Sequence, residues 1–318
     1  MRVAVSGANG FVGQALVRQL TSCGHQVLAY VRRPRDFFET AGAIPLAMLD
    51  LHLHADWRLT TTQEIDVLVH CAARVHILND TSSDCLADFR RVNVEGTANL
   101  ARQAAAAGVQ RFVFLSSIKV NGEFTEVGHP FTADDAPAPE DPYGVSKHEA
   151  EQLLREIASE TGMEVVIIRP PLVYGPGVKA NFESMMRWLA RGVPLPLAAV
   201  TQNRRSLVAL DNLVHLIMVC SSHPAAANQT FLVSDGEDLS TVELLRRMST
   251  ALGHPARLFY LPPSLLKLGA QVVNKPGIYQ RLCGSLQLDI TKTRQLLGWT
   301  PPVSVNEGLR SAAEGFRA

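Results

Sequence analysis

The chain has 318 residues, 47% of them hydrophobic and 19% charged, a composition typical of globular proteins and not of disordered chains. Its 30 Lys and Arg residues balance 30 Asp and Glu residues, and this zero net charge argues against a nucleic-acid partner. The 5 cysteines are scattered and form no Cys-x-x-Cys pair, so we expect no disulfide framework, no zinc site and a cytoplasmic location. No apolar run approaches the ~18 residues of a membrane span, so we expect none.

The N-terminal stretch reads as a strand, a glycine-rich turn and a helix. Arg2–Ser6 is apolar, residues 7–13 have the spacing Gly-x-x-Gly-x-x-Gly, and residues 14–23 carry apolar side chains at helical spacing. Glycines permit a tight turn and a close backbone approach, and the N-terminus of the following helix then faces a pyrophosphate. We therefore predict that this turn binds a dinucleotide through Gly7, Asn9, Gly10, Phe11, Val12 and Gly13.

The second predicted strand, Gln26–Val31, ends without the acidic residue that binds the ribose 2′-hydroxyl in NAD-binding proteins. Arg32 and Arg33 stand there instead. Two guanidinium groups at this place suit a 2′-phosphate, so the sequence favours NADP(H), with NAD(H) as the alternative cofactor. The competing interpretation of the two arginines is a solvated basic turn.

Residues 44–50 predict a third strand, which would place Asp50 and Leu51 near the adenine of a bound cofactor. His52, His54 and Asp56 alternate in the segment that follows. Such an alternation could hold a metal ion, but a polar loop is the commoner structure for it, so we predict no metal site.

A fourth strand is predicted over residues 65–73. Its last residues, Cys71, Ala72 and Ala73, are small and would let a cofactor lie against the backbone. A long helix is predicted over residues 88–107, because its apolar side chains recur at helical spacing and a glycine follows it.

The fifth predicted strand, Arg111–Leu115, is almost continuously apolar, as expected for a parallel strand covered on both faces. It runs into Ser116 and Ser117. Ligands in parallel sheets bind at the carboxyl ends of the strands, so these two hydroxyl groups are predicted to lie at the binding edge.

A helix is predicted to begin near Asp141 and run to about Glu160, with Tyr143 and Lys147 one turn apart on one face. A phenol has a reference pKa of about 10 and is a poor base near pH 7. An ammonium group about 4 Å away contributes about 4 kcal/mol at an effective dielectric near 20, or roughly three pKa units before desolvation of the lysine is subtracted. We therefore predict a pair that exchanges a proton with a sugar or alcohol oxygen. Taken alone, the spacing is more typical of an exposed surface pair.

A sixth strand over residues 165–168 completes a regular alternation of strands and helices. The alternation predicts an α/β protein with a doubly wound parallel Rossmann-type sheet. We assign residues 1–172 to a dinucleotide-binding domain and residues 173–318 to a smaller C-terminal substrate-binding lobe, with some segments returning to the first domain. Within this lobe, the apolar residues 261–273 predict a buried helix, with a membrane-surface helix as the alternative.

The order of these motifs resembles the extended short-chain dehydrogenases/reductases, a group that contains UDP-hexose 4-epimerases, dehydratases and ketoreductases. The resemblance covers nearly the whole chain. It rests on the glycine turn and on His70-Cys71-Ala72-Ala73, Asn93-Val94-Glu95-Gly96-Thr97, Ser116-Ser117, Tyr143-x-x-x-Lys147, Arg169-Pro170, Val173-Tyr174-Gly175-Pro176-Gly177 and Leu297-Gly298-Trp299.

The resemblance implies catalytic roles for three residues. Tyr143 would be the general acid/base, Lys147 would lower its pKa and bind the nicotinamide ribose, and Ser117 would hydrogen-bond the reacting sugar oxygen. Ser116 would be a cofactor or packing residue. Further cofactor contacts are implied for Asn93, Pro170 and Val173.

The resemblance also implies a UDP-linked sugar as the substrate and a homodimer as the assembly. Asn181 and Arg205 match segments that contact the nucleotide diphosphate in relatives, although the neighbouring Arg204 could replace Arg205. Arg281 lies where a second phosphate-binding arginine often occurs, but the usual Arg-Pro-Gly-Asp run is absent. Lys119 is predicted at the mouth of the pocket, either in contact with substrate or exposed to solvent.

Three functions compete at this point. The stretch around Ser117 and Lys119 resembles a branch that handles UDP-linked 4-keto-6-deoxy-N-acetylhexosamines in surface-polysaccharide synthesis. Together with Arg32 and Arg33 it favours an NADPH-dependent 4-ketoreductase. The alternative is a UDP-hexose or UDP-N-acetylhexosamine 4-epimerase, which uses the same Tyr, Lys and Ser. A non-catalytic NADP sensor is the third interpretation.

Overall fold

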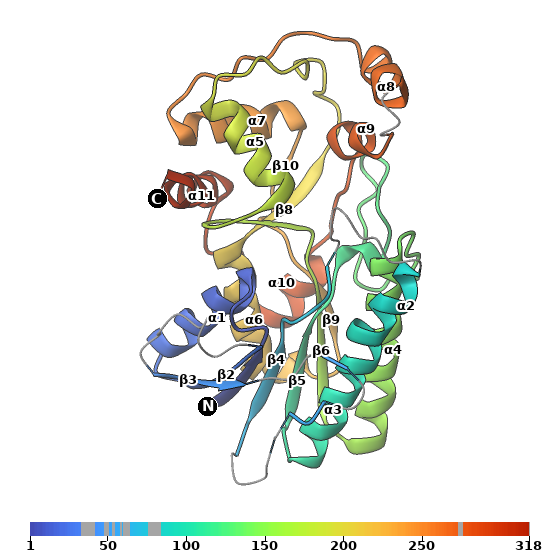
Figure 1. Ribbon diagram of the computed structural model, residues 1–318, viewed down its shortest axis with the longest axis vertical. Helices are drawn as coiled ribbons and strands as arrows, with labels where there is room; N and C mark the ends of the chain where they lie inside the picture. Colours follow the sequence, from blue (N-terminus) through green and yellow to red (C-terminus); the bar gives the residue numbers. More distant parts are fainter. Residues whose placement is uncertain are drawn as a thin grey trace.

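A computed structural model of the chain shows a large sheet flanked by helices, with a smaller lobe above the carboxyl ends of its strands (Figure 1). The structure describes residues 1–32, 42–47, 51–52, 55–57, 59, 64–75, 84–272 and 276–317.

Within the described residues, the large sheet has seven parallel strands in the order β3-β2-β1-β4-β5-β6-β9. Crossing from β1 to β4 reverses the direction in which the chain builds the sheet, so the predicted doubly wound parallel fold is confirmed. The strands are β1 (Arg2–Ser6), β2 (Gln26–Val31), β3 (Ala43–Ala47), β4 (Val67–His70), β5 (Arg111–Leu115), β6 (Glu164–Arg169) and β9 (Thr230–Leu232).

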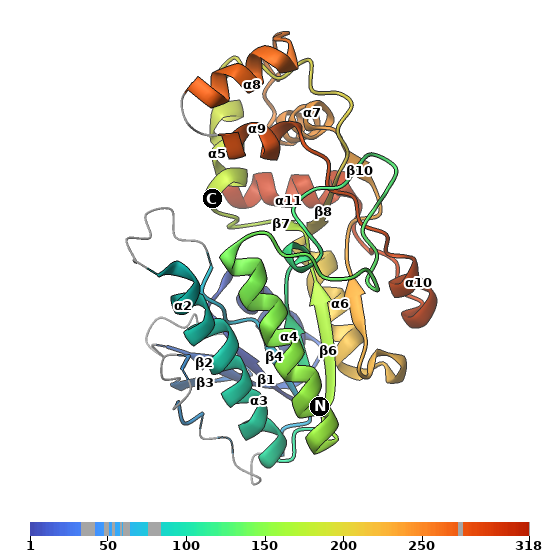
Figure 2. The ribbon, with the colours of Figure 1, turned by 90° about the vertical axis from the view of Figure 1, so that its right-hand side faces the viewer.

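Helices cover both faces of this sheet, as the nearly unbroken apolar strands require (Figure 2). One face is covered by α1 (Phe11–Ser22), α6 (Leu210–Ser222) and α10 (Thr291–Leu297), whose leucines join a single buried cluster with the strands. The other face is covered by α3 (Gly96–Ala106) and α4 (Pro142–Thr161). Since α6, β9 and α10 come from the second half of the sequence, the chain returns repeatedly to the sheet.

The helix predicted over residues 88–107 is interrupted. A short α2 (Cys85–Phe89) is followed by one segment of π-helix, η3 (Arg90–Glu95), before α3 begins. Extra residues of this kind inside a helix occur frequently at functional sites, because they redirect a side chain that a regular helix would place elsewhere. Here the π-helical segment carries Asn93, whose contacts are described below.

The smaller lobe is built on a three-stranded sheet in the order β10-β8-β7. These strands are β7 (Leu172–Tyr174), β8 (Arg205–Ala209) and β10 (Asp238–Leu239). Their partners are α5 (Ala180–Ala190), α7 (Thr241–Leu252) and α11 (Val305–Arg317), which share one apolar cluster with this sheet.

Two helices, α8 (Pro263–Val272) and α9 (Pro276–Cys283), lie at the outer edge of this lobe (Figure 1). The prediction of a buried helix over residues 261–273 is wrong. Leu265 and Leu268 on α8 are 50% and 55% exposed, and Leu266 is the leucine of this helix that packs against the lobe's core. In the described part of the chain no helix has both the length and the apolar character needed to cross a membrane.

Candidate active site

The glycine turn between β1 and α1 is tightly folded against the end of β4. Gly7 has a φ of +69°, and a Cβ placed there would lie 2.7 Å from the backbone nitrogen of Ala72. A Cβ at Gly13 would lie 2.1 Å from the carbonyl oxygen of Gly7. Gly10 is the N-cap of α1 and provides no side-chain cap, so the first N–H groups of α1 are available to an anion. This geometry fits the pyrophosphate of a dinucleotide.

Replacing Gly13 by alanine should therefore damage both stability and cofactor binding. The new methyl group cannot occupy its position unless the turn opens, and overpacking of this kind costs about 1–3 kcal/mol. We expect a lower denaturation midpoint and at least a tenfold weaker dinucleotide affinity, measured by chemical unfolding and by titration calorimetry. Gly24→Ala is the control, because a Cβ at Gly24 would meet no atom within 4 Å. The φ of Gly24 is +78°, so alanine there should lower the denaturation midpoint. The dinucleotide affinity of this control should not change.

A cleft of about 740 Å³ extends from the glycine turn across the carboxyl ends of β1, β2 and β4. The side chains of Arg74 and Arg91 also reach it, although the sequence did not predict them there, and the described lining residues include no acid. Of the predicted cofactor residues, the cleft is lined by Gly7, Asn9, Gly10, Arg32, Leu51, Cys71, Ala72 and Ala73. Arg33 and Asp50 lie outside the described residues.

The predicted catalytic helix is α4, and its start is well defined. Asp141 is the N-cap, its Oδ1 accepts a 2.6 Å hydrogen bond from the backbone N–H of Gly144, and Pro142 occupies the first turn. The amine of Lys147 is buried: it donates to the carbonyl oxygen of Leu115 at 2.8 Å and lies 6.0 Å from the centre of the Tyr143 ring. The sequence spacing thus places both groups beside the end of β5, at the binding edge of the sheet.

The titration of this pair differs from the sequence expectation. Burial raises the pKa of Tyr143, and the nearby carboxylate of Asp141 raises it further. Burial lowers the pKa of Lys147 to about 8, against the opposing effects of Cys71 and Glu151. The expected lowering of the phenol pKa by Lys147 is not found, because burial and the charge of Asp141 both act to raise it.

The two serines after β5 have different surroundings. Ser117 is the N-cap of the 3₁₀ turn η4 (Ile118–Val120), and its Oγ accepts from the backbone N–H of Lys119 at 3.3 Å. Ser116 is buried, and its Oγ donates to Glu151 at 2.6 Å. Its hydroxyl is therefore already bonded to Glu151, and Ser116 is not a lining residue of the cofactor cleft.

Asn93 forms hydrogen bonds both to Arg74, which lines the cofactor cleft, and to Ser146 on α4. Its side chain accepts from the backbone N–H of Arg74 at 2.8 Å and donates to that residue's carbonyl oxygen at 3.0 Å. It also donates to the Oγ of Ser146 at 3.0 Å, and Ser146 donates in turn to the carbonyl oxygen of Tyr143. The π-helical segment thus aligns the loop after β4 with the residue predicted to do the chemistry.

A buried ion pair between Arg169 and Glu151 lies behind the site. Arg169 belongs to a motif identified in the sequence, but Glu151 was not predicted from the sequence. Arg169, at the end of β6, donates to both carboxylate oxygens of Glu151 at 2.9 and 2.5 Å and to Asn121 at 2.9 Å. Both members of the pair are at most 2% exposed. The position of Glu151, one helical turn after Lys147, was the signal that could have identified it.

A second cavity, of about 640 Å³, lies between η4 and the helices α8 and α9. It brings together Lys119 and Arg281, two of the predicted substrate residues, which are far apart in the sequence. Lys119 donates to Glu123 at 2.8 Å and to Asp141, and Arg281 donates to the carbonyl oxygen of Gly277 at 3.0 Å.

The other predicted contact residues are not lining residues of this cavity. Asn181 is exposed at the start of α5, and Arg205 donates to the carbonyl oxygen of Gly284 at 3.1 Å. Pro170 is buried, and its carbonyl oxygen accepts from Ile118 at 3.0 Å. Val173, on β7, packs partly buried against the main core.

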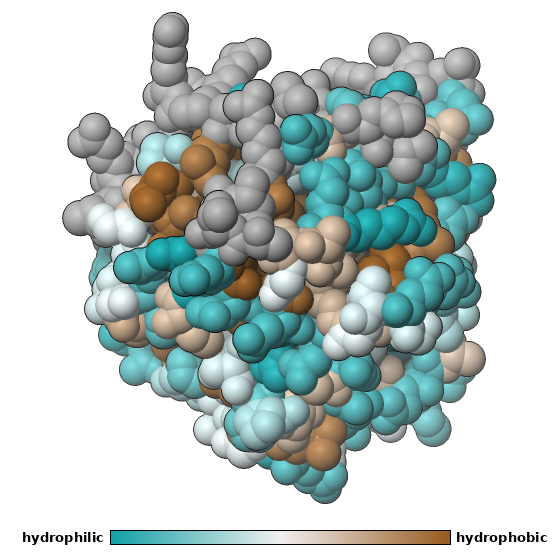
Figure 3. Space-filling model, turned by 90° about the horizontal axis from the view of Figure 1, so that it is seen from below, coloured by the Kyte–Doolittle hydropathy of each residue, from teal (hydrophilic) through white to brown (hydrophobic). Residues whose placement is uncertain are grey.

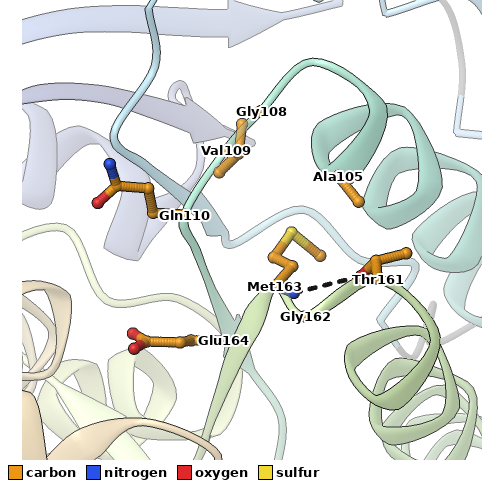
Figure 4. A pocket seen from close by; sticks show the side chains of 8 residues that line it. All are labelled: Ala105, Gly108, Val109, Gln110, Thr161, Gly162, Met163 and Glu164. Carbon is orange, nitrogen blue, oxygen red and sulfur yellow. Dashed lines mark hydrogen bonds between the residues drawn. The ribbon is translucent and has the colours of Figure 1, made fainter.

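A further pocket, of about 450 Å³, lies at the opposite edge of the sheet (Figure 4). Its walls include Gln110 and Glu164, which stand at the amino ends of β5 and β6, together with the ends of α3 and α4. Glu164 already pairs with Arg111 at 2.6 Å. The view from below shows hydrophilic side chains over most of the described surface at this end (Figure 3). This pocket is remote from Tyr143 and Ser117, so we do not assign the active site to it.

Comparison with known proteins agrees with this geometry. Residues 3–234 match the NAD dependent epimerase/dehydratase family. The chain is 46% identical over 314 residues to a UDP-glucose 4-epimerase of Vibrio cholerae, covering 99% of this chain and 95% of that protein. A UDP-glucose 4-epimerase of Mycolicibacterium smegmatis is 30% identical over 342 residues, covering 100% of this chain and 99% of that protein.

Solved structures show the same architecture. MoeE5 in complex with UDP-glucuronic acid and NAD has a TM-score of 0.77 at 27% identity, covering 100% of this chain and 99% of that one. A UDP-glucose 4-epimerase of Thermotoga maritima with UDP-glucose shares the fold with a TM-score of 0.78 at 22% identity, covering 100% of this chain and 99% of that one.

The chain belongs to the NAD dependent epimerase/dehydratase family. The resemblance to extended short-chain dehydrogenases/reductases is therefore confirmed, as is the prediction that the protein is an enzyme of this class.

Proposed function

We propose that the protein is an NAD-dependent UDP-hexose 4-epimerase. The observation that carries the proposal is the placement of Tyr143 and the buried amine of Lys147 at the end of β5, beside a cleft built for a dinucleotide. The 46% identity to a UDP-glucose 4-epimerase over nearly the whole chain favours epimerisation over the 4-ketoreductase that the sequence pattern predicted.

A nicotinamide bound in this cleft supplies an acceptor and donor for the hydrogen at C4 of the sugar. The chain's own residues handle the proton: Tyr143 removes it from the 4-hydroxyl group and later returns it to the same oxygen. Ser117, at the start of η4, is proposed to hold that oxygen by a hydrogen bond. Lys147 is proposed to bind the ribose and to stabilise the phenolate, an effect that acts against the burial that raises the pKa of Tyr143.

We propose NAD as the cofactor, against the preference for NADP drawn from Arg32 and Arg33. The family is described as NAD dependent, and MoeE5 was solved with NAD bound. Arg32 lies at the cleft, and the described lining residues carry no carboxylate for a ribose 2′-hydroxyl, so none of these described residues would repel a 2′-phosphate. The nucleotide that co-purifies with the protein, analysed by mass spectrometry, distinguishes the two.

The cavity shared by Lys119 and Arg281 is proposed to receive the UDP-sugar. Arg281 stands on α9 with one side-chain hydrogen bond to a backbone carbonyl, so its guanidinium can still bind a diphosphate bidentately. Arg205 and Asn181 are retained as proposed diphosphate contacts on the strength of the resemblance alone.

The 4-ketoreductase remains a second candidate because of Arg32 at the cleft and the stretch from Ser117 to Glu123. The non-catalytic sensor is a weaker candidate, since the Tyr, Lys and Ser of the reaction are all present. We also propose a homodimer that associates through α3 and α4, which lie side by side on one face of the sheet (Figure 2), and a cytoplasmic location, in line with the five free cysteines.

The test is the incubation of purified protein with UDP-glucose and no added cofactor. We expect UDP-galactose to form until the two sugars reach equilibrium, followed by nuclear magnetic resonance of the anomeric protons. Turnover that occurs only with a 4-keto sugar and consumes NADPH stoichiometrically would establish the reductase instead. Absence of turnover with either substrate, together with tight dinucleotide binding, would favour the sensor.

A further inference from the structure

A cluster of three charged side chains lies at the start of α4, the helix that carries Tyr143. Lys119, on η4, donates hydrogen bonds to Glu123 at 2.8 Å and to the Oδ2 of Asp141. The other oxygen of Asp141 caps α4 through Gly144 at 2.6 Å. The Asp141 carboxylate is thus held from two sides, by the backbone at the start of α4 and by the amine of Lys119. Asp141 precedes Tyr143 by two residues.

The backbone makes this arrangement rigid. A Cβ at Gly144 would lie 2.8 Å from the carbonyl oxygen of Lys119, so η4 and the first turn of α4 are in direct contact. The carbonyl oxygen of Val120 also accepts from Ala138, in the segment that leads to α4, at 2.9 Å. The side chains of Lys119 and Asp141 are 36% and 16% exposed, so water screens the pair only in part.

The charged groups near Tyr143 in the described residues come from α4 and from the segments packed against its start. Lys147 lies on the same helix, and Arg74, after β4, stands 5.8 Å over the ring of Phe89, which contacts the Tyr143 ring at 6.0 Å. Lys119 approaches from η4 with its two carboxylates. Burial is the largest cause of the raised pKa of Tyr143, and the negative charge of Asp141 is the second. An uncompensated Asp141 would therefore oppose the phenolate that the proposed reaction needs.

We infer that Lys119 is a positioning residue that holds the Asp141 carboxylate in its capping geometry, two residues before Tyr143, and offsets part of its charge there. This role rests on the proposed function, because it presupposes that Tyr143 exchanges a proton with substrate. It differs from the predicted contact between Lys119 and the sugar, since Lys119 acts here on the acid–base residue through Asp141.

The test is the pH dependence of kcat at saturating UDP-glucose. Removing the amine in Lys119→Met leaves Asp141 unpaired, so the ascending limb of the profile should move to higher pH by roughly one unit, which is tenfold in rate on that limb. Asp141→Asn keeps a good N-cap residue but removes the charge, so the limb should move to lower pH. The double variant should return toward the wild-type profile, and Lys119→Arg should restore it.

Glu123→Gln is the matched control, because Glu123 binds the same amine while the pKa of Tyr143 responds to Asp141. The ascending limb of the pH profile of kcat should move less in Glu123→Gln than in Lys119→Met. The inference is wrong if Lys119→Met lowers kcat equally at every pH, or if it raises KM and leaves the limb in place. These outcomes are separable from a failure of the proposed function, in which the wild-type protein would not convert UDP-glucose to UDP-galactose at any pH.

Discussion

Replacing Tyr143 by phenylalanine is expected to lower kcat for UDP-glucose by about 10²- to 10⁴-fold, the usual contribution of a positioned general acid/base. The substitution removes one oxygen and keeps the ring that packs against Phe89 with centroids 6.0 Å apart. The fold and the dinucleotide cleft should therefore be unchanged. The measurement is turnover at saturating substrate, with dinucleotide affinity and the thermal midpoint determined on the same preparation.

The matched control is Tyr174→Phe. Tyr174 is a buried phenol whose hydroxyl donates to Asp235 at 2.7 Å within the smaller lobe. Its loss should reduce stability, because a buried carboxylate loses a hydrogen bond, but kcat of the folded fraction should stay within a few-fold of wild type. If Tyr143→Phe were no more damaging to kcat than Tyr174→Phe, the acid/base assignment would be wrong.

The largest effect on stability is expected at the buried pair of Glu151 and Arg169. In Arg169→Leu a carboxylate with no exposed surface loses its bidentate partner, and breaking such a pair from one side costs about 3–5 kcal/mol. Arg155 binds the same carboxylate at 3.2 Å from a side chain that is 48% exposed. Arg155→Leu should cost no more than about 1 kcal/mol. Urea unfolding at pH 7 compares the two.

The pH dependence of this effect has a defined sign. Burial opposes the charge of Glu151, but hydrogen bonds from Arg169 and Ser116 hold its pKa below the ordinary value of 4.5. A lowered native pKa gives stability that is present above pH 4.5 and lost as the pH falls through the native value. Without Arg169, burial raises the pKa of Glu151. Protonating the carboxyl group then removes the free-energy cost of a buried, unpaired charge. The stability difference between wild type and Arg169→Leu should therefore shrink as the pH falls from 7 toward 5, and a constant difference would contradict this account.

The main sheet and the pair on α4 could be predicted because local pattern determines them. Apolar strands covered on both faces have a distinctive composition, and Tyr143 and Lys147 are related by one helical turn. The interruption of the long helix by the π-helical segment that carries Asn93 was not predictable in this way. A π-helical segment depends on the groups that a side chain meets, here Arg74 and Ser146.

Contacts between distant segments account for most of what the sequence could not predict. Lys119 and Arg281 share one cavity, whereas Arg205 binds the carbonyl of Gly284 and Asn181 is exposed; no sequence spacing distinguishes these outcomes. The apolar content of residues 261–273 suggested burial, but composition does not say which neighbours cover a helix. Glu151 was recognisable by its spacing from Lys147, yet its partner Arg169 comes from a separate strand.

The most direct test of the central claim uses UDP-glucose deuterated at C4, incubated with purified protein in ordinary water without added cofactor. If Tyr143 moves only the proton on oxygen while the hydrogen on carbon is taken up and returned within one closed site, the UDP-galactose formed must retain the deuterium at C4. Mass spectrometry of the product measures this. Loss of the label to solvent, or the absence of UDP-galactose from protein that carries bound NAD, would contradict the account.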